Sequence, residues 1–321
     1  MTLDNDELPK TFVLNNGVQI PTVGLGTWQA PLNATRDAVS FALQQGYRHL
    51  DCAYIYLNER EVGEGIRASG VPRSEVFVTS KVWNLFQDDV AGNLEKTLDN
   101  LGLDYVDLYN TSLTLGVLQL VHWPIKFLPA DAGAPNPLRP LNPDGTYKVD
   151  RTWDQGVTWA GMEAVYAAGK ARAIGVCNWS IPYLEALAKS WKVVPAVNQV
   201  ENHPFLPQHA LKAWCDARGI LLEAYSPLGG PGAPVLQDED IVAVAKRNGV
   251  TPATVLISYQ VNRGIVPLPK SVSHERLVQN LRVVRLSAED MALLDGLAAK
   301  GKAQRLNKPP FCWDLGFDDW D

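Results

Sequence analysis

The sequence predicts a single α/β domain built as a (β/α)8 TIM barrel, and three observations lead to this fold class. Eight short apolar segments of strand length alternate with helical segments along the 321 residues. A glycine follows each of the clearest helical segments, where helices commonly end: Gly46, Gly102, Gly169 and Gly219. No change of composition marks a domain boundary, so residues 1–321 are expected to form one domain.

An N-terminal β-hairpin precedes the barrel in this prediction. It covers residues 11–21, where two apolar runs flank the turn sequence Asn15-Asn16-Gly17. The barrel strands are expected at residues 22–28, 49–54, 76–83, 118–123, 171–178, 195–202, 221–228 and 265–271. The clearest helices are expected at residues 35–46, 89–102, 156–170 and 207–219. An extra helix and loop are expected at the C-terminal end.

A doubly wound sheet is the alternative fold. Its dinucleotide-binding version would carry G-x-G-x-x-G after the first strand. Here GLGTWQ supplies Gly24 and Gly26 but has Gln29 where the third glycine would stand. The Pro-rich stretch from Phe127 to Val149 follows the fourth expected strand. In a barrel this position lies at the C-terminal face, where active-site loops belong.

Charge and composition narrow the function classes. A formal net charge of -6 argues against an extended surface for nucleic acid or an acidic membrane. The cysteines have neither metal-site nor redox-motif spacing, so no metal site and a reducing cytoplasm are expected: Cys52, Cys177, Cys215 and Cys312. The N-terminus lacks a basic region followed by an apolar run, and no window has membrane-spanning length.

Polar residues stand at the expected C-terminal ends of successive strands: Asp51, Tyr56, Lys81 and His122. Taken singly, such residues are more often caps, solvated charges or packed side chains. In a barrel, however, these strand ends meet at one mouth. Tyrosine, with an ordinary pKa of about 10, becomes a better general acid when an ammonium favours its phenolate. We therefore expect Asp51 to pair with Lys81 and Lys81 to tune Tyr56.

This set suits carbonyl reduction. His122 can hydrogen-bond the same substrate oxygen that Tyr56 protonates, and the hydride must come from a cofactor. With these residues the chain resembles the aldo-keto reductases, a family of NADP-dependent (β/α)8 oxidoreductases. The resemblance runs from about Phe12 to Leu294 and rests on GLGTW, YRHLDCAYIYLNEREVG, TSKVW, VHWP, AIGVCNW, NQVENHP, AYSPLG and PLPKSVSHERLVQN.

The resemblance implies roles for individual residues. Tyr56 would be the proton donor, with Lys81 and Asp51 tuning it and His122 orienting the carbonyl. The implied substrate pocket is lined by Trp28, Ile55, Tyr56, Trp83, His122 and Trp123. Without the resemblance, these tryptophans would be assigned to core or loop packing.

The resemblance also implies an NADPH or NADP+ site. Asn178 and Gln199 would fix the nicotinamide carboxamide, and the Tyr225 ring would stack on the nicotinamide. Residues implied along the rest of the cofactor, at the ribose and pyrophosphate or beside the nicotinamide, are Gly26, Thr27, Trp28, Asp51, Cys177, Ser226, Pro227 and Leu228.

The segment PKSVSHERLVQN carries the choice of cofactor. Lys270, Ser271 and Arg276 bring two cations and a hydroxyl to the start of a helix, which suits a phosphate monoester. The alternative is a helix N-cap at Ser273 with solvated charges. With the resemblance, Lys270 and Arg276 should hold the 2′-phosphate of NADPH. The same segment supplies Val272 to the implied cofactor site, with Gln279 and Asn280 near the adenine.

The chain departs from the family pattern twice. Cys177 stands where the family usually has serine, and a thiol is a weaker hydrogen-bond donor than a hydroxyl. Roughly Asn110 to Gln119 looks inserted before LVHWP. We expect Val117 to His122 to take the fourth strand and Tyr105 to Gly116 to form a longer connection at the N-terminal face. Alternatively, YVDLY remains the strand and the insertion bulges toward the mouth, or the segment is an error of the gene model.

The expected function is reduction of aldehydes by NADPH in the cytoplasm. Small polyol or sugar aldehydes are the expected substrates, with aromatic aldehydes as surrogates. Val272 stands where xylose reductases usually have asparagine, which favours an aldehyde or glycerol-type reductase. The expected partner is a small carbonyl compound, neither nucleic acid nor a membrane, and the chain is expected to be a monomer or weak dimer. The alternatives are a cofactor-binding regulatory barrel and a structural protein on the same scaffold.

Overall fold

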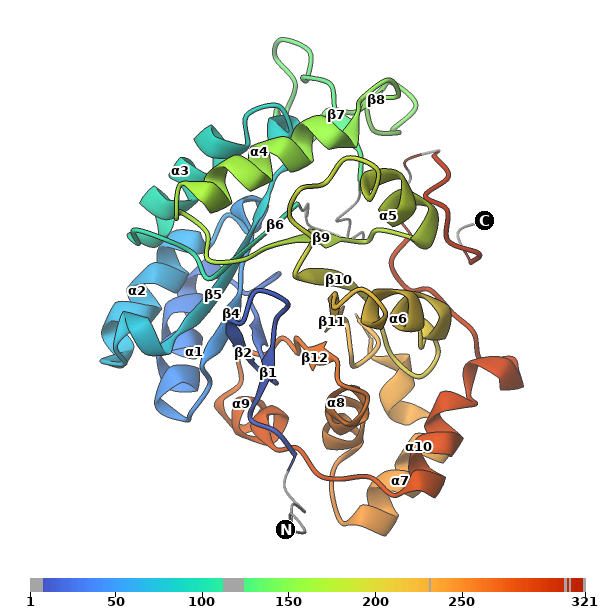
Figure 1. Cartoon of the computed structure of the whole chain (residues 1–321). Helices are drawn as coiled ribbons and strands as arrows, with labels where there is room; N and C mark the ends of the chain where they lie inside the picture. Colours follow the sequence, from blue (N-terminus) through green and yellow to red (C-terminus); the bar gives the residue numbers. More distant parts are fainter. Residues whose placement is uncertain (1–7, 112–123, 231, 309–310, 312, 320–321) are drawn as a thin grey trace.

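Eight parallel strands form a closed barrel in the computed structural model, which describes residues 8–111, 124–230, 232–308, 311 and 313–319 (Figure 1). The strands, in sequence and neighbour order, are β3 (Leu25–Gly26), β4 (His49–Asp51), β5 (Phe77–Val82), β6 (Leu108–Thr111), β9 (Ile174–Cys177), β10 (Val197–Glu201), β11 (Leu221–Tyr225) and β12 (Val266–Pro267). The barrel closes between its first and last strands, where Gly24 N donates to Pro267 O at 3.0 Å and Gly26 N to Pro269 O at 3.1 Å. The predicted (β/α)8 fold is confirmed.

Helices surround the strands (Figure 1). Those between successive strands are α1 (Leu32–Gln44), α2 (Glu59–Ser69), α3 (Val90–Leu101), α4 (Gln155–Ala167), α5 (Ile181–Leu187), α6 (His209–Asp216), α7 (Glu239–Asn248) and α8 (Pro252–Asn262). After β12 come α9 (His274–Leu281) and α10 (Ala288–Asp295). The single turns are η1 (Tyr54–Tyr56), η2 (Arg73–Glu75), η3 (Asn84–Phe86), η4 (Pro234–Gln237) and η5 (Ala298–Lys300). Among the described residues, no helix combines the length and apolarity that crossing a membrane requires.

Local sequence explains the bounds of a helix such as α3. The Asp89 carboxylate accepts a hydrogen bond from Gly92 N at 3.0 Å and so caps the helix start. Leu94 and Leu98 are buried one turn apart and pack α3 against the barrel. Gly102 ends the helix at φ 65°, a conformation that favours glycine. The predicted stop at this glycine is confirmed.

Two hairpins close opposite ends of the barrel. The predicted N-terminal hairpin is confirmed as β1 (Thr11–Val13) and β2 (Gln19–Pro21), which pair antiparallel. Its turn reaches the N-terminal face, where Asn16 Nδ2 donates to Arg172 O at 2.9 Å, just before β9. At the other face, β7 (Lys126–Phe127) pairs antiparallel with β8 (Val149–Asp150), at the two ends of the Pro-rich stretch.

The fourth strand corrects one prediction. Leu108–Thr111, and not Val117 to His122, lies between β5 and β9 as β6. The assignment of Tyr105 to Gly116 to an N-terminal connection is therefore wrong. The alternative strand YVDLY, residues 105–109, shares Leu108 and Tyr109 with β6, which ends two residues later. Residues 112–123 lie outside the described residues. A deletion of Asn110 to Gln119 would remove two residues of β6 itself.

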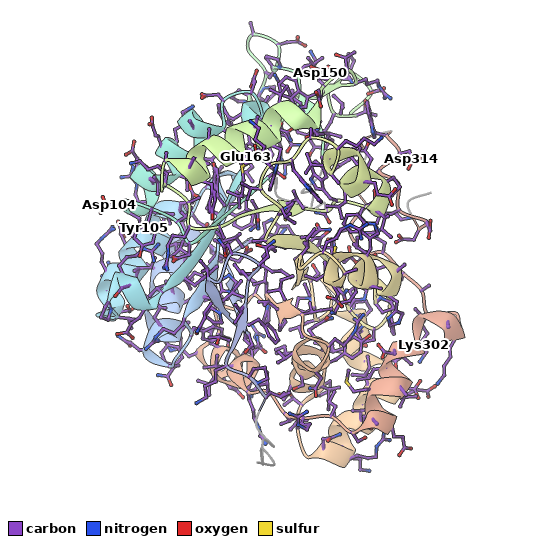
Figure 2. All side chains as sticks on the ribbon, in the orientation of Figure 1. Asp104, Tyr105, Asp150, Glu163, Lys302 and Asp314 are labelled. Carbon is purple, nitrogen blue, oxygen red and sulfur yellow. The ribbon has the colours of Figure 1, made fainter. Side chains whose placement is uncertain are left out.

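Asp107 gives the physical reason for this strand position. Its buried carboxylate accepts a hydrogen bond from Val78 N at 3.0 Å and pairs with Arg73 at 2.8 Å and Arg172 at 2.9 Å. These contacts fix the start of β6 against β5 and β9. Moving the strand to a later segment would leave the arginines without this partner. Tyr105, two residues earlier, lies at the periphery of the molecule (Figure 2).

Candidate active site

Three of the four predicted catalytic residues meet at the C-terminal end of the barrel. Asp51 ends β4, Lys81 lies in β5, and Tyr56 ends the turn η1 that follows β4. Asp51 is in register with Thr79, so Lys81, two residues further on, shares the inward face of β5. Lys81 Nζ donates to Asp51 Oδ1 at 2.6 Å, to Cys52 O at 2.7 Å and to Tyr56 OH at 3.2 Å.

The ammonium of Lys81 therefore uses all three of its donors. Lys81 and Asp51 are 1% and 4% exposed, whereas Tyr56 is only partly buried. Burial alone would lower the pKa of Lys81, but the Asp51 carboxylate and the Tyr56 hydroxyl outweigh it and raise the pKa above its ordinary value. Lys81 thus stays charged and faces the oxygen of Tyr56. An ammonium in contact with a hydroxyl is the arrangement expected for the predicted role of Tyr56 as an acid.

His122 and Trp123 lie outside the described residues, so their predicted roles stay predictions. Ile55 and Trp83 are each only 1% exposed. They lie in an apolar cluster at the mouth, to which the Pro-rich loop and the C-terminal segment also contribute. The Trp83 and Phe127 rings meet edge to face, with centroids 6.0 Å apart. No sequence pattern singles out Phe127, because an aromatic residue in a loop has no periodic pattern around it.

A cavity of about 380 Å³ joins Tyr56 to the predicted cofactor residues. The predicted residues that line it are Gly26, Trp28, Asp51, Tyr56, Tyr225, Ser226, Pro227, Leu228, Lys270, Ser271, Val272, Arg276, Gln279 and Asn280. Lining residues that were not predicted are Gln29, Gly230, Ala233, Leu236, Ala253, Leu268 and Pro269. The predicted residues Thr27, Cys177, Asn178 and Gln199 are buried in the barrel and are not part of this lining.

Asn178 and Gln199 present complementary polar atoms. Tyr225 OH donates to Asn178 Oδ1 at 2.9 Å, and Gln199 Nε2 donates to Asp51 Oδ1 at 3.0 Å. Within the described part of the chain, Asn178 Nδ2 and Gln199 Oε1 are buried without a hydrogen-bond partner. Buried polar atoms are normally satisfied, so one donor and one acceptor remain here for a ligand. A carboxamide, with one carbonyl and one NH2 group, fits this pair.

The start of α9 presents two cations to the cavity. Ser271 Oγ accepts hydrogen bonds from Ser273 N at 3.1 Å and from Arg276 Nε at 3.4 Å, while the Ser273 side chain makes no capping bond. Desolvation, and then repulsion from Arg276, lowers the pKa of Lys270. Neither cation forms an ion pair with a described carboxylate. Two unneutralised cations beside a helix N-terminus fit a phosphate group.

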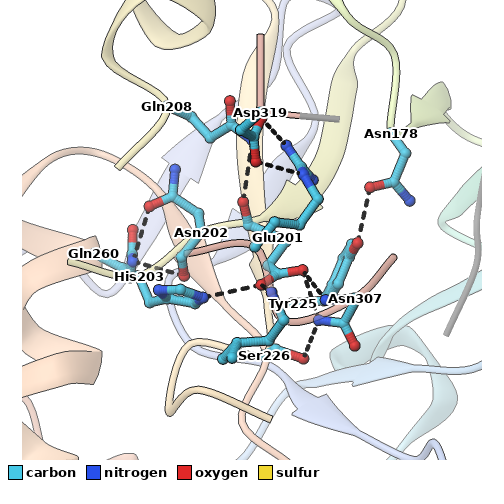
Figure 3. Close-up of polar contacts among 12 residues, drawn as sticks. Asn178, Glu201, Asn202, His203, Gln208, Tyr225, Ser226, Gln260, Asn307 and Asp319 are labelled. Carbon is cyan, nitrogen blue, oxygen red and sulfur yellow. Dashed lines mark hydrogen bonds and ion pairs between the residues drawn. The ribbon is translucent and has the colours of Figure 1, made fainter. Parts of the chain in front are cut away.

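The C-terminal segment is tied to the same mouth through Glu201, the last residue of β10 (Figure 3). Glu201 accepts hydrogen bonds from Leu306 N at 2.7 Å, Asn307 N at 3.0 Å and Asn307 Nδ2 at 2.6 Å. Burial alone would raise the pKa of Glu201, but its donors, with His203 first, hold the pKa below its ordinary value. Asn307 also reaches Ser226 Oγ at 3.5 Å, so this anchor borders the cavity.

Comparison of the sequence with known proteins agrees with the fold described above. The model of the aldo/keto reductase family matches residues 22–299. The chain is 46% identical over 318 residues to D-galacturonate reductase of Hypocrea jecorina, covering 96% of this chain and 98% of that protein. It is 44% identical to two proteins of Saccharomyces cerevisiae: aldehyde reductase YPR1, with 90% of each chain covered, and glycerol 2-dehydrogenase (NADP(+)), with 94% of each chain covered.

Proposed function

The chain belongs to the aldo/keto reductase family and is an oxidoreductase of carbonyl compounds, and we propose that it reduces aldehydes to alcohols with NADPH. One observation carries this proposal: the buried Lys81 ammonium joins Asp51 to the Tyr56 hydroxyl at the wall of the cavity. Such a hydroxyl can protonate an oxygen that is gaining negative charge. NADPH, when bound, would supply the hydride.

The side chains of the site would carry out the proton transfer and orient the substrate. Tyr56 gives its proton to the carbonyl oxygen of the substrate, and Lys81 stabilises the phenolate that is left. Asp51 keeps Lys81 charged and directed at Tyr56. Proton transfer of this kind typically contributes about 10² to 10⁴ in rate. His122 would hydrogen-bond the same substrate oxygen and orient the carbonyl, as the resemblance implies.

The choice of NADPH is supported by the cations at the start of α9. Lys270 and Arg276 would bind the 2′-phosphate that distinguishes NADPH from NADH, with Ser271 between them. At the other end, Asn178 Nδ2 and Gln199 Oε1 would bind the carboxamide of the nicotinamide. Asn178 bonds Tyr225 and Gln199 bonds Asp51, and both of these partners line the cavity that Lys270 and Arg276 also line, which supports one extended dinucleotide as the ligand of both ends.

Hydroxylated aldehydes are the proposed substrates. Two relatives at 46% and 44% identity are named for D-galacturonate and glycerol, which share a polyol character. The apolar cluster around Trp83 and Phe127 would accept aromatic aldehydes as surrogates.

The test is the loss of NADPH absorbance with a panel that contains glyceraldehyde, aldopentoses, galacturonate and an aromatic aldehyde. Tyr56→Phe is the matched control, because it removes only the phenolic oxygen. This variant should lose most turnover while NADPH still quenches tryptophan fluorescence. Near-normal turnover by Tyr56→Phe would reject the assignment of the acid. Tight NADPH binding without reduction of any aldehyde would favour the alternative, a cofactor-binding regulatory barrel impaired by the insertion near residues 110–119.

A further inference from the structure

A buried carboxyl group that the proposed mechanism does not use lies beside Gln199. Glu223 stands in β11, fully buried and in register with Gln199 of β10. Its Oε2 accepts a hydrogen bond from Gln199 Nε2 at 2.8 Å, and its Oε1 lies 3.7 Å from His49 Nε2. Among the described residues, no lysine or arginine forms an ion pair with Glu223. The carboxyl group is therefore buried without a cationic partner.

Glu223 fixes the orientation of the Gln199 amide together with Asp51. The NH2 group of Gln199 donates to Asp51 Oδ1 at 3.0 Å and to Glu223 Oε2 at 2.8 Å, which uses both of its hydrogens. A flipped amide would set the carbonyl oxygen against the Asp51 carboxylate, which can only accept hydrogen bonds. Gln199 Oε1 is thus kept as the acceptor that remains for the carboxamide of the cofactor.

The surroundings of Glu223 decide its charge. The polar and charged groups around it are Gln199 on the adjacent strand β10, His49 and Asp51 on β4, and Lys81 on β5, with Thr79 bonded to His49. Burial, followed by the negative charge of Asp51, raises the pKa of Glu223 to about 8 against the opposing effects of Gln199 and Lys81. Burial lowers the pKa of His49 to about 3, so His49 stays neutral and cannot compensate an anion. Glu223 is a neutral acid at neutral pH and becomes an anion in mildly alkaline solution.

We propose that Glu223 is a positioning residue whose proton sets the preference of the site for reduced or oxidised cofactor. As a neutral acid it holds Gln199 without adding charge. As a carboxylate it places a second negative charge, beside that of Asp51, one amide away from the nicotinamide end. The oxidised nicotinamide ring is a cation, whereas the reduced ring is neutral, so the carboxylate favours NADP+ over NADPH. This inference rests on the proposed function.

The experiment measures the dissociation constants of NADP+ and NADPH across mildly acidic to alkaline pH. It is done in the Tyr56→Phe background, so that the proposed proton donor makes no contribution to the pH dependence. The ratio of NADPH to NADP+ dissociation constants should rise by roughly tenfold as Glu223 ionises, the usual scale for one partly screened charge inside a protein. Adding Glu223→Gln should flatten this dependence, since glutamine keeps an acceptor for Gln199 but cannot ionise.

Glu59→Gln in the same background is the matched control. Glu59 is also a buried acid, but it bonds Ser80 and Asn100 and makes no contact with Gln199. This variant should keep the pH-dependent ratio. Infrared difference spectra of the cofactor-free protein supply a second readout: Glu59 and Glu223 should each give a protonated-carboxyl band that disappears with rising pH, and the band lost at the higher pH should be missing after Glu223→Gln but kept after Glu59→Gln.

The outcomes separate the two proposals. A ratio that does not change with pH in the Tyr56→Phe protein overturns the role of Glu223 without needing a further variant to fold. A pH dependence that survives Glu223→Gln also overturns it. Failure of NADPH to bind at any pH would instead reject the proposed function.

Discussion

Removing the Lys81 ammonium should cost stability and activity in ways that a double-mutant cycle can separate. Lys81→Met keeps the length of the side chain but leaves the Asp51 carboxylate, 4% exposed, with Gln199 as its remaining side-chain donor among the described residues. Removing one partner of a buried ion pair typically costs about 3–5 kcal/mol. Asp51→Asn alone strands the Lys81 ammonium and should cost a similar amount.

The double variant, Asp51→Asn with Lys81→Met, contains neither charge. Its free energy of unfolding should therefore exceed the value expected from adding the single losses, by about 2–3 kcal/mol. Turnover should not recover, because Tyr56 still lacks the ammonium that favours its phenolate. Urea unfolding followed by tryptophan fluorescence measures the first quantity, and NADPH consumption measures the second.

Two results would contradict this reasoning. Additive losses of stability, within about 0.5 kcal/mol, would mean that the two side chains do not interact in the folded protein. Recovery of aldehyde reduction in the double variant would mean that Tyr56 does not depend on Lys81 for its acidity.

Other predictions concern the cofactor and a second buried acid. Lys270→Met with Arg276→Ala should raise the KM for NADPH far more than that for NADH, since a desolvated cation on a phosphate is worth about 2 kcal/mol or more; equal use of both cofactors by the unmutated protein would contradict the assignment. Cys177→Ser should tighten NADPH binding by about 0.5 to 1.5 kcal/mol in a fluorescence titration, and unchanged or weaker binding would reject it. Burial raises the pKa of Glu59 to about 7, so the folded protein binds more protons than the unfolded chain and loses about 3 kcal/mol of stability as pH rises from about 4.5 to about 7. Glu59→Gln should remove that slope in urea unfolding, and an unchanged slope would show that Glu59 is already ionised in the folded state.

The sequence predicted the barrel and the Asp51, Tyr56 and Lys81 set because both depend on short-range patterns. Strand and helix periods alternate visibly, and Asp51 and Lys81 stand near the ends of neighbouring strands. The resemblance to a known family supplied the cofactor residues at the start of α9. These parts needed no knowledge of which distant residues pair.

The position of β6, in contrast, depends on ion pairs between residues that are far apart in the sequence. Two nearby segments are apolar enough to form a strand, and the local sequence favours neither. Asp107 decides between them through Arg73 and Arg172, which lie 34 and 65 residues away along the chain. The contact of Gln199 with Glu223 could not be predicted from the sequence for the same reason, because it depends on the register of two parallel strands.

The anchor at Glu201 has a consequence for synthesis on the ribosome. Its backbone donors, Leu306 and Asn307, follow it by 105 and 106 residues. A nascent chain can therefore form most of the barrel while Glu201 lacks these donors and has His203 as its side-chain partner, and a buried carboxylate with too few donors is unstable. The mouth is completed only after Leu306 and Asn307 have left the ribosome. A chain that ends before them should therefore be recognised by cellular quality control as defective before it can consume cofactor.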